Sequence, residues 1–271
     1  MNAQNFTDAH DLAQYLIEKY AGKARQILDV GCGSGAMLRE MAQTLKASGC
    51  GIDPFVFESG EESVCFKPLK AQELTLLGCR FDLVYTVHSL HHFEKVPQFL
   101  RALEKTLSWS GVFVLVDWKK GAQTGIPERY FSLKEITNLI KDFNFKLLES
   151  GEAGDNFYLV ATLRQRCLAV ATDEQGKEIF PKMFGQAPFF DLYLLEDGRF
   201  RFLQKRKNIY QKTMQHEKTL DVYGEVPECQ TLLARRIGRQ GQQRLREKGV
   251  YMFFEEGSVN AALEEIAKLT E

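Results

Sequence analysis

The sequence lacks the features that mark membrane, secreted and strongly charged proteins. No apolar run approaches the roughly 20 residues that a helix needs to span a bilayer, and the N-terminus has neither a basic nor an apolar leader segment. The 35 Lys and Arg are matched by 36 Asp and Glu, which leaves a net charge of -1. This balance argues against a generally basic nucleic-acid-binding surface. We therefore expect a cytoplasmic protein without a membrane or nucleic-acid partner.

Cysteine is also scarce, and its spacing excludes the usual structural metal motifs. The six cysteines stand singly in apolar runs, with no C-x-x-C pair and no zinc-type spacing. They are Cys32, Cys50, Cys65, Cys79, Cys167 and Cys229. We expect all six to be reduced thiols in the core.

The length of 271 residues exceeds the usual size of one domain and favours two. Strand-like and helix-like segments alternate through the first part of the chain, which predicts a doubly wound parallel α/β sheet. After Arg164 the pattern restarts with an apolar strand at 167–171. We therefore predict domains at 1–164 and 166–271, the second a smaller α/β unit.

A glycine-rich turn, Gly31 to Gly35, lies between a predicted buried strand and a predicted helix. Its three glycines let the backbone pass close to a ligand, and the helix N-terminus offers free N–H groups. Asp53 follows 18 residues after Gly35, at the end of the next predicted strand, where a carboxylate can accept hydrogen bonds from ribose hydroxyls. This spacing predicts a nucleoside site, although the glycines could instead only shape the turn and Asp53 only cap a strand.

Four motifs in order carry a resemblance to a known family. They are Ile27-Leu-Asp-Val-Gly-Cys-Gly-Ser-Gly35, Gly51-Ile-Asp53, Leu74 followed by Phe81-Asp-Leu-Val84, and Ser89-Leu-His-His92. Over about the first 160 residues the chain resembles the type 11 class I methyltransferases. The resemblance implies a Rossmann-like doubly wound sheet of seven strands. It also implies that S-adenosylmethionine is the cofactor and S-adenosylhomocysteine the product.

The same resemblance implies which residues surround the cofactor. The set comprises Asp29, Gly31, Cys32, Gly33, Gly35, Asp53, Pro54, Ala71, Gln72, Thr86 and Val87. Lys70 departs from the family, which commonly places there an acidic residue that accepts from the adenine amino group. Phe6 and Tyr15 either cover the cofactor or pack as ordinary helix aromatics.

On the acceptor side, no universal catalytic residue is expected, because methyl transfer depends mainly on positioning and exclusion of water. His88 follows the fourth predicted strand and is our candidate for a catalytic base. His91 and His92 could suggest a metal, but we favour a packing role and predict no metal site. Asp117 and Trp118 could form a wall of the acceptor pocket. Trp118 could equally belong to the core.

The second domain carries a separate resemblance. The segments Cys167-Leu-Ala-Val-Ala-Thr-Asp173, Met183-Phe-Gly-Gln-Ala-Pro-Phe-Phe190, Asp197-Gly198 and Arg236-Ile-Gly238 resemble the dinitrogenase iron-molybdenum cofactor biosynthesis domain. This implies a ribonuclease H-like α/β fold and an iron-sulfur type cluster as candidate ligand. Met183 departs from the histidine usual in that family. The alternative is a generic α/β appendage that packs or forms a homodimer.

Between 199 and 248 the chain has 13 Lys and Arg against 5 Asp and Glu. This local excess of positive charge predicts an anionic ligand, or otherwise a solvated basic face. We therefore expect an S-adenosylmethionine-dependent methyltransferase that acts on a small-molecule acceptor, with a C-terminal domain for an anionic ligand or metallocluster. The alternative is a metallocluster-binding or regulatory protein whose first domain binds the nucleoside without methyl transfer. The complete glycine turn and Asp53 favour the enzyme.

Overall fold

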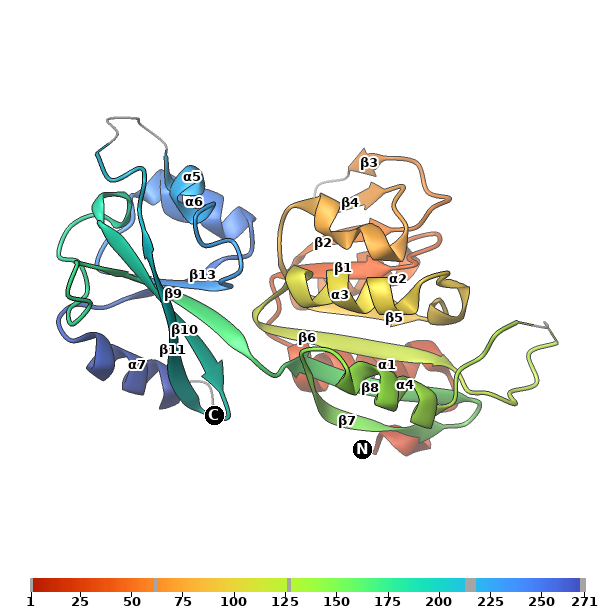
Figure 1. Ribbon diagram of the computed structural model, residues 1–271. Helices are drawn as coiled ribbons and strands as arrows, with labels where there is room; N and C mark the ends of the chain where they lie inside the picture. The colour runs from red at the N-terminus through yellow and green to blue at the C-terminus, as the bar shows by residue number, and fades with distance from the viewer. Residues whose placement is uncertain (1, 61–62, 126–127, 213–217, 269–271) are drawn as a thin grey trace. The chain divides into compact units, whose positions relative to one another are not determined.

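The chain divides into two compact units, residues 1–163 (unit 1) and 164–271 (unit 2), and each is built on its own sheet (Figure 1). The computed structural model describes residues 2–60, 63–125, 128–212 and 218–268. None of the helices in these ranges is long and apolar enough to cross a membrane.

The sheet of unit 1 has the strand order β3-β4-β2-β1-β5-β6-β8-β7. Its strands are β1 (Gln26–Val30), β2 (Ser48–Ile52), β3 (Ser59–Gly60), β4 (Val64–Lys67), β5 (Phe81–Val87), β6 (Leu107–Trp118), β7 (Phe145–Ala153) and β8 (Asn156–Leu163). The five strands from β4 to β6 are parallel, whereas β8 runs antiparallel to both of its neighbours. Seven strands form the predicted doubly wound sheet, and the two-residue β3 adds an eighth at its edge.

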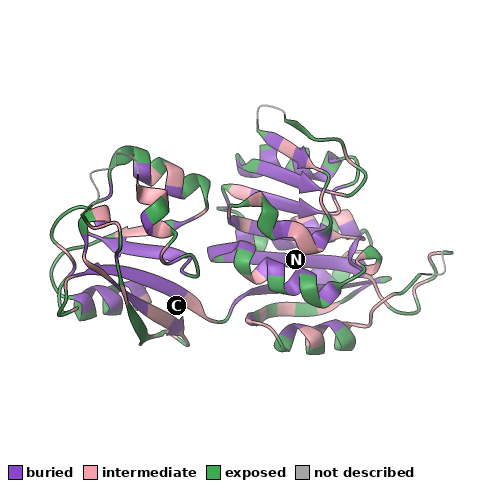
Figure 2. Ribbon diagram, turned by 45° about the horizontal axis from the view of Figure 1, so that its top comes forward, coloured by how far each residue is buried: buried purple, intermediate pink, exposed green. Residues whose placement is uncertain are grey.

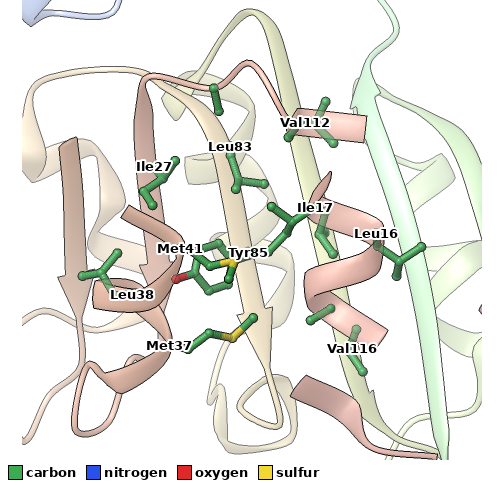
Figure 3. Packing of buried hydrophobic residues seen from close by; sticks show 14 of the residues in the cluster. Leu16, Ile17, Ile27, Met37, Leu38, Met41, Leu83, Tyr85, Val112 and Val116 are labelled. Atoms are coloured by element: carbon green, nitrogen blue, oxygen red, sulfur yellow. The ribbon is translucent and has the colours of Figure 1, made fainter. Parts of the chain in front are cut away.

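Helices cover both faces of this sheet. They are η1 (Ala3–Asn5), α1 (Ala9–Ala21), α2 (Ala36–Leu45), η2 (Ala71–Leu77), η3 (Leu90–His92), α3 (Val96–Thr106) and α4 (Leu133–Lys141). One face packs against α1 and α2, and the other against η2, α3 and α4. Figure 3 shows the first of these layers, where Ile17 and Met41 from the two helices approach Tyr85 of β5.

Local sequence signals explain where the helix α4 begins and where β10 (Phe189–Glu196) turns into β11 (Arg199–Lys207). α4 begins at a capping box in which Ser132 Oγ accepts from Glu135 N at 3.2 Å and Ser132 N donates to Glu135 Oε2 at 2.8 Å. In unit 2, Asp197 and Gly198 have φ values of 47° and 73°. Both lie in the left-handed region that a tight primed turn requires, and this turn joins the antiparallel strands β10 and β11 as a hairpin.

The order of unit 1 reverses between β1 and β5, because the chain passes from β1 to β2 on one side and later returns to β5 on the other. In open α/β sheets the crevice outside the carboxyl ends of the strands at such a reversal is the usual ligand site. The glycine turn follows β1 directly, and Asp53 follows β2. The fold therefore brings the two sequence signals to this position.

Unit 2 is the smaller α/β domain, with the strand order β11-β10-β9-β12-β13. Its elements are β9 (Arg166–Thr172), η4 (Phe184–Gln186), β10 (Phe189–Glu196), β11 (Arg199–Lys207), α5 (Thr219–Tyr223), β12 (Thr231–Ala234), α6 (Arg239–Glu247), β13 (Tyr251–Phe254) and α7 (Val259–Lys268). β12 and β13 run parallel to β9, whereas β10 is antiparallel to β9 and β11. The strands β8 and β9 are buried almost throughout, whereas β11 is largely exposed (Figure 2).

One sequence expectation about cysteine is wrong. Cys167 and Cys229 form a disulfide, whereas Cys32, Cys50, Cys65 and Cys79 are in no disulfide. The pairing of β12 with β9 explains the bond, because Gln230 N donates to Cys167 O at 3.1 Å and Cys167 N donates to Gln230 Oε1 at 2.7 Å. These hydrogen bonds hold the residue before β12 beside the start of β9. The spacing of the two cysteines in the sequence does not reveal this proximity.

Candidate functional site

The glycine turn after β1 has a backbone that only glycine adopts readily. Gly31, Gly33 and Gly35 have φ values of 80°, 50° and 73°. A Cβ would lie 2.5 Å from Ser89 Oγ at Gly31 and 2.3 Å from Phe66 Cε1 at Gly35, but at Gly33 it would meet nothing within 4 Å. Packing therefore requires two of the glycines, whereas the third faces open space where a ligand can approach the backbone.

Asp53 joins the turn after β1 to the turn after β2. Its Oδ2 accepts from Gly33 N at 3.3 Å, and its Oδ1 accepts from Phe55 N at 2.9 Å. Gly31 N and Cys32 N also donate to Ile52 O, at 2.8 and 3.1 Å. The two turns thus form one hydrogen-bonded unit, with a half-buried carboxylate beside the exposed Gly33.

Asp29 lies buried on β1 directly opposite Tyr85 of β5. Burial raises the pKa of Asp29 to about 7, the neighbouring Tyr85 hydroxyl opposes the rise, and the charge of Asp53 adds to it. A carboxyl group that titrates near neutrality therefore stands directly before the glycine turn.

The other residues implied for the cofactor lie along the same edge of the sheet. Ala71 and Gln72 open η2 after β4, and Thr86 and Val87 end β5. Because β4, β2, β1 and β5 are neighbours, the ends of these strands form one continuous row. Cys32 is buried and Pro54 is exposed within the two turns already described.

Two side chains on this row differ in whether the protein itself supplies a partner. The Thr86 hydroxyl is buried without a hydrogen-bond partner among the described residues, which leaves it able to bond to a ligand. Lys70 Nζ lies 3.2 and 3.3 Å from the two carboxylate oxygens of Glu94. The position that departs from the family is therefore engaged in an ion pair on the protein itself.

His88 is held in a strained and well-defined position after β5. Its φ of 48° lies in the left-handed region, which is uncommon for a residue with a side chain. The imidazole stacks on Trp118, with ring centroids 4.0 Å apart, and Nε2 lies 2.7 Å from the buried Asn156 Oδ1. Since an amide oxygen only accepts, Nε2 carries the proton and Nδ1 keeps a lone pair. Trp118 therefore packs against the candidate base.

His91 is held differently, because both of its ring nitrogens face carboxylates. Nδ1 lies 2.7 Å from Asp117 Oδ1, and Nε2 lies 3.0 Å from Glu128 Oε2. Burial opposes ionisation, but Asp117 and the charge of Glu128 raise the pKa of His91. His92 Nδ1 lies 3.5 Å from Glu128 Oε1. His91 is thus less suited than His88 to accept a proton from an acceptor.

The structure also adds residues that sequence reasoning missed. Asn156 lies 68 positions from His88, and Glu128 lies in a loop far along the chain from His91. Neither stands in a motif, so no local signal could have identified them. Phe6 and Tyr15, with ring centroids 5.1 Å apart, pack against the core layer formed by α1 and α2.

In unit 2 the residues singled out from the sequence meet at the ends of parallel strands. Met183 and Arg236 are paired by a β-bridge, and Phe184 N donates to Arg236 O at 2.8 Å. Arg235 Nη2 lies 2.7 Å from Glu256 Oε2, whereas the exposed Arg236 has no ion-pair partner in the described part of the chain. Within those described residues, unit 2 contains no group of three His, Cys, Asp or Glu close enough to hold a metal ion.

Comparison with known proteins identifies both units. A family model described as methyltransferase domain matches residues 1–150, and one described as dinitrogenase iron-molybdenum cofactor matches residues 165–269. A tRNA U34 carboxymethyltransferase from Alcanivorax borkumensis is 33% identical over 34% of this chain and 32% of its own length. A ubiquinone biosynthesis O-methyltransferase from Azorhizobium caulinodans is 29% identical over 34% and 40%. The chain thus spans less than half the length of these relatives.

Solved structures similar to this chain are distant from it in sequence. A Burkholderia thailandensis 1,6-didemethyltoxoflavin-N1-methyltransferase with bound S-adenosylhomocysteine superposes with a TM-score of 0.48 at 20% identity, over 58% of this chain and 78% of its own. An S-adenosylmethionine-dependent methyltransferase from Aquifex aeolicus gives a TM-score of 0.47 at 19% identity, over 58% and 94%. The family model, by contrast, covers more than half of the chain. This chain therefore belongs to the methyltransferase domain family and carries a dinitrogenase iron-molybdenum cofactor domain after its methyltransferase domain.

Proposed function

We propose that the chain is an S-adenosylmethionine-dependent methyltransferase that acts on a small-molecule acceptor. One observation carries this proposal: the open Gly33 backbone and the Asp53 carboxylate are hydrogen-bonded to each other where the strand order reverses. A nucleoside sulfonium needs close backbone approach and a ribose acceptor, and this pair supplies both. The remaining residues of the row are assigned from their places beside it.

In this proposal Asp53 accepts from the ribose hydroxyls, and Ala71 and Gln72 lie beside the adenine. The turn from Gly31 to Gly35, with Asp29 behind it, holds the methionine part, while Cys32 and Pro54 complete the walls. Thr86 and Val87 face the sulfonium end, where the unpartnered Thr86 hydroxyl is a ready donor or acceptor.

Methyl transfer is an in-line displacement in which a lone pair on the acceptor bonds to the methyl carbon as the carbon–sulfur bond breaks. S-adenosylhomocysteine leaves with the electron pair of that bond. Where the acceptor carries a proton, His88 Nδ1 accepts it, because Nε2 is already engaged by Asn156 Oδ1 at 2.7 Å. The stack on Trp118 fixes the plane of the imidazole.

The charge of unit 1 favours a small acceptor over RNA. Residues 1–163 contain 17 Lys and Arg against 20 Asp and Glu, so this unit is net acidic. A polyanionic acceptor is bound mainly through clustered cations on the protein. Because some relatives are named as tRNA carboxymethyltransferases, tRNA must nevertheless be tested as an alternative acceptor.

The test begins with calorimetry of S-adenosylmethionine and S-adenosylhomocysteine. Asp53→Ala should weaken both by roughly 1 to 3 kcal/mol, the range for losing hydrogen bonds to a charged group. Asp82→Ala is the matched control, because Asp82 accepts from Arg25 N at 2.9 Å and Gln26 N at 3.1 Å at the opposite end of β1. It should leave cofactor affinity of the folded protein unchanged. Equal affinities for wild type and Asp53→Ala would refute the site.

A second measurement separates the enzyme from a nucleoside-binding regulator. Wild-type protein is supplied with methyl-labelled cofactor and, separately, with thiols, amines, phenols and tRNA. Transfer to a small molecule supports the proposal, transfer to tRNA alone replaces the acceptor class, and tight binding without transfer to any acceptor supports the regulatory alternative.

For unit 2, we propose recognition of an anionic ligand at the ends of β9 and β12, where Arg236 lies beside Met183. The basic stretch 199–248 supports this, although its residues 213–217 lie outside the described part of the chain. The described residues do not fit an iron-sulfur cluster held by thiolates, because Cys167 and Cys229 are joined in a disulfide and Met183 offers only a thioether. Anion recognition is thus better supported than cluster binding.

A further inference from the structure

Three side chains near the end of β5 converge on one point in unit 1. One ligand atom from each of His91, His92 and Glu128 can be chosen so that all three lie within 4.8 Å of one another. The two histidines come from η3, whereas Glu128 comes from the loop between β6 and α4. The sequence shows only the adjacent histidines, so the third member is a finding of the structure.

Each histidine lies about one tetrahedral zinc-ligand edge from an oxygen of the Glu128 carboxylate, although the two contacts use different oxygens. Zn–N and Zn–O bonds of about 2.0 to 2.1 Å place the ligand atoms of a tetrahedron about 3.4 Å apart. His91 Nε2 lies 3.0 Å from Glu128 Oε2, and His92 Nδ1 lies 3.5 Å from Glu128 Oε1. Little movement would be needed for the three groups to share one ion.

Asp117 orients the first ligand from behind. Its Oδ1 lies 2.7 Å from His91 Nδ1 and its Oδ2 accepts from His91 N at 3.0 Å, while its side chain is only 1% exposed. A carboxylate on Nδ1 fixes the tautomer that leaves the Nε2 lone pair free, which is the usual arrangement around zinc-bound histidine. That lone pair then faces the carboxylate of Glu128. Two electron-rich atoms 3.0 Å apart require a positive charge between them, either a proton or a metal ion.

We propose that His91, His92 and Glu128 bind a Zn²⁺ ion, with Asp117 as the positioning residue behind His91. Two imidazoles and one carboxylate are a ligand set that zinc uses when a fourth position stays open. The side chains of His92 and Glu128 are 59% and 29% exposed, so water can reach that position. This site is independent of whether the chain transfers methyl groups.

The experiment uses the full chain, stripped with EDTA and titrated with Zn²⁺ by calorimetry. His92→Ala and Glu128→Gln should each weaken binding at this site by at least about tenfold, because even the loss of a residue that only supports a ligand costs that much. His10→Ala is the matched control, because His10 Nε2 lies 3.1 Å from Glu40 Oε2 in a single histidine–carboxylate pair elsewhere in unit 1. It should bind Zn²⁺ like wild type.

A spectroscopic readout separates coordination from a general effect on the fold. Co²⁺ substituted for Zn²⁺ should give the strong visible absorption of a tetrahedral ion in wild type and in His10→Ala, and lose it in the two ligand variants. Asp117→Asn should weaken Zn²⁺ binding by about 10-fold to 100-fold. If wild type binds no Zn²⁺, or if His92→Ala and Glu128→Gln bind it as tightly as wild type, the four side chains form only a proton-bridged ion-pair network.

Discussion

At the scale of single residues, Asp29 links the stability of unit 1 to pH. Its pKa is about 7 in the folded protein against an ordinary 3.8, so between these values the folded chain holds a proton that the unfolded chain has lost. The free energy of unfolding therefore falls as pH rises through this window, by about 1.4 kcal/mol for each unit of pKa difference.

Asp29→Asn should flatten this dependence, since the amide does not ionise. Urea unfolding at pH 5 and pH 8 should show a smaller loss of stability in the variant than in wild type. Asp11→Asn, at an exposed position of α1, is the control and should keep the wild-type slope. A wild-type protein that is equally stable at both pH values would contradict the prediction.

His88 offers a test of proton transfer that preserves the backbone. Asn tolerates the left-handed conformation better than Ala, so His88→Asn keeps the φ of 48° while removing the imidazole. Turnover should fall by about 10²- to 10⁴-fold, the usual contribution of a general base, with little change in cofactor affinity. Single-turnover rates with an identified acceptor provide the measurement. A variant that keeps the full rate would exclude His88 as the base.

At this scale, a site residue could be predicted from the sequence only where its signal lies in neighbouring residues. The glycine turn was predictable because its backbone angles and its strand-to-helix context involve only neighbouring residues. Asn156 and Glu128 were not, because each meets its histidine only after distant strands and loops are placed. The histidine pair was visible in the sequence, but not the carboxylate that turns it into a three-ligand cluster.

At the scale of elements, the disulfide between Cys167 and Cys229 ties β9 to the start of β12. It closes a loop between residues 62 positions apart, and loop-closure entropy predicts about 4 kcal/mol of stabilisation for such a length. Cys229→Ser should lower the stability of unit 2 by roughly this amount in denaturant unfolding.

Reductant supplies the matching comparison. It should destabilise wild type but have no further effect on Cys229→Ser. Equal stability of oxidised and reduced wild-type protein would show that the bond contributes nothing.

Strand direction was the weakest part of the fold prediction. Alternating strands and helices predicted a parallel sheet, yet β8 is antiparallel to β6 and β7. All eight of its residues are buried. A continuous apolar strand is typical of parallel sheets, so its pattern carried no sign of the reversal. The short β3 was missed because a strand of two exposed residues has no hydrophobic pattern to detect.

At the scale of the whole molecule, we predict that residues 166–271 fold by themselves, because unit 2 has its own sheet and its own core. The isolated unit should bind polyanions such as polyphosphate, and more weakly as salt rises, since exposed charges are screened beyond about 8 Å at physiological ionic strength. Arg236→Ala should lower this affinity more than Arg236→Lys, because lysine keeps the charge.

Met183→His tests the metallocluster alternative in the same unit. If position 183 faces a cluster, restoring the family's usual donor should produce cluster absorbance on anaerobic reconstitution with iron and sulfide. If neither wild type nor Met183→His gains absorbance, and Arg236→Ala binds polyanions like wild type, only a packing or dimerisation role remains for unit 2.

The position of β8, last in the sequence of unit 1 but inside its sheet, has a consequence for synthesis on the ribosome. β8 is the last strand of unit 1, yet it lies inside the sheet between β6 and β7, and β9 begins after only Arg164 and Gln165. Until residue 163 has left the exit tunnel, β7 has no partner in the sheet and one edge of β6 stays unpaired. Unit 1 must therefore wait for translation of its final strand, and a nascent chain released earlier would expose the unpaired edges of β6 and β7 to aggregation.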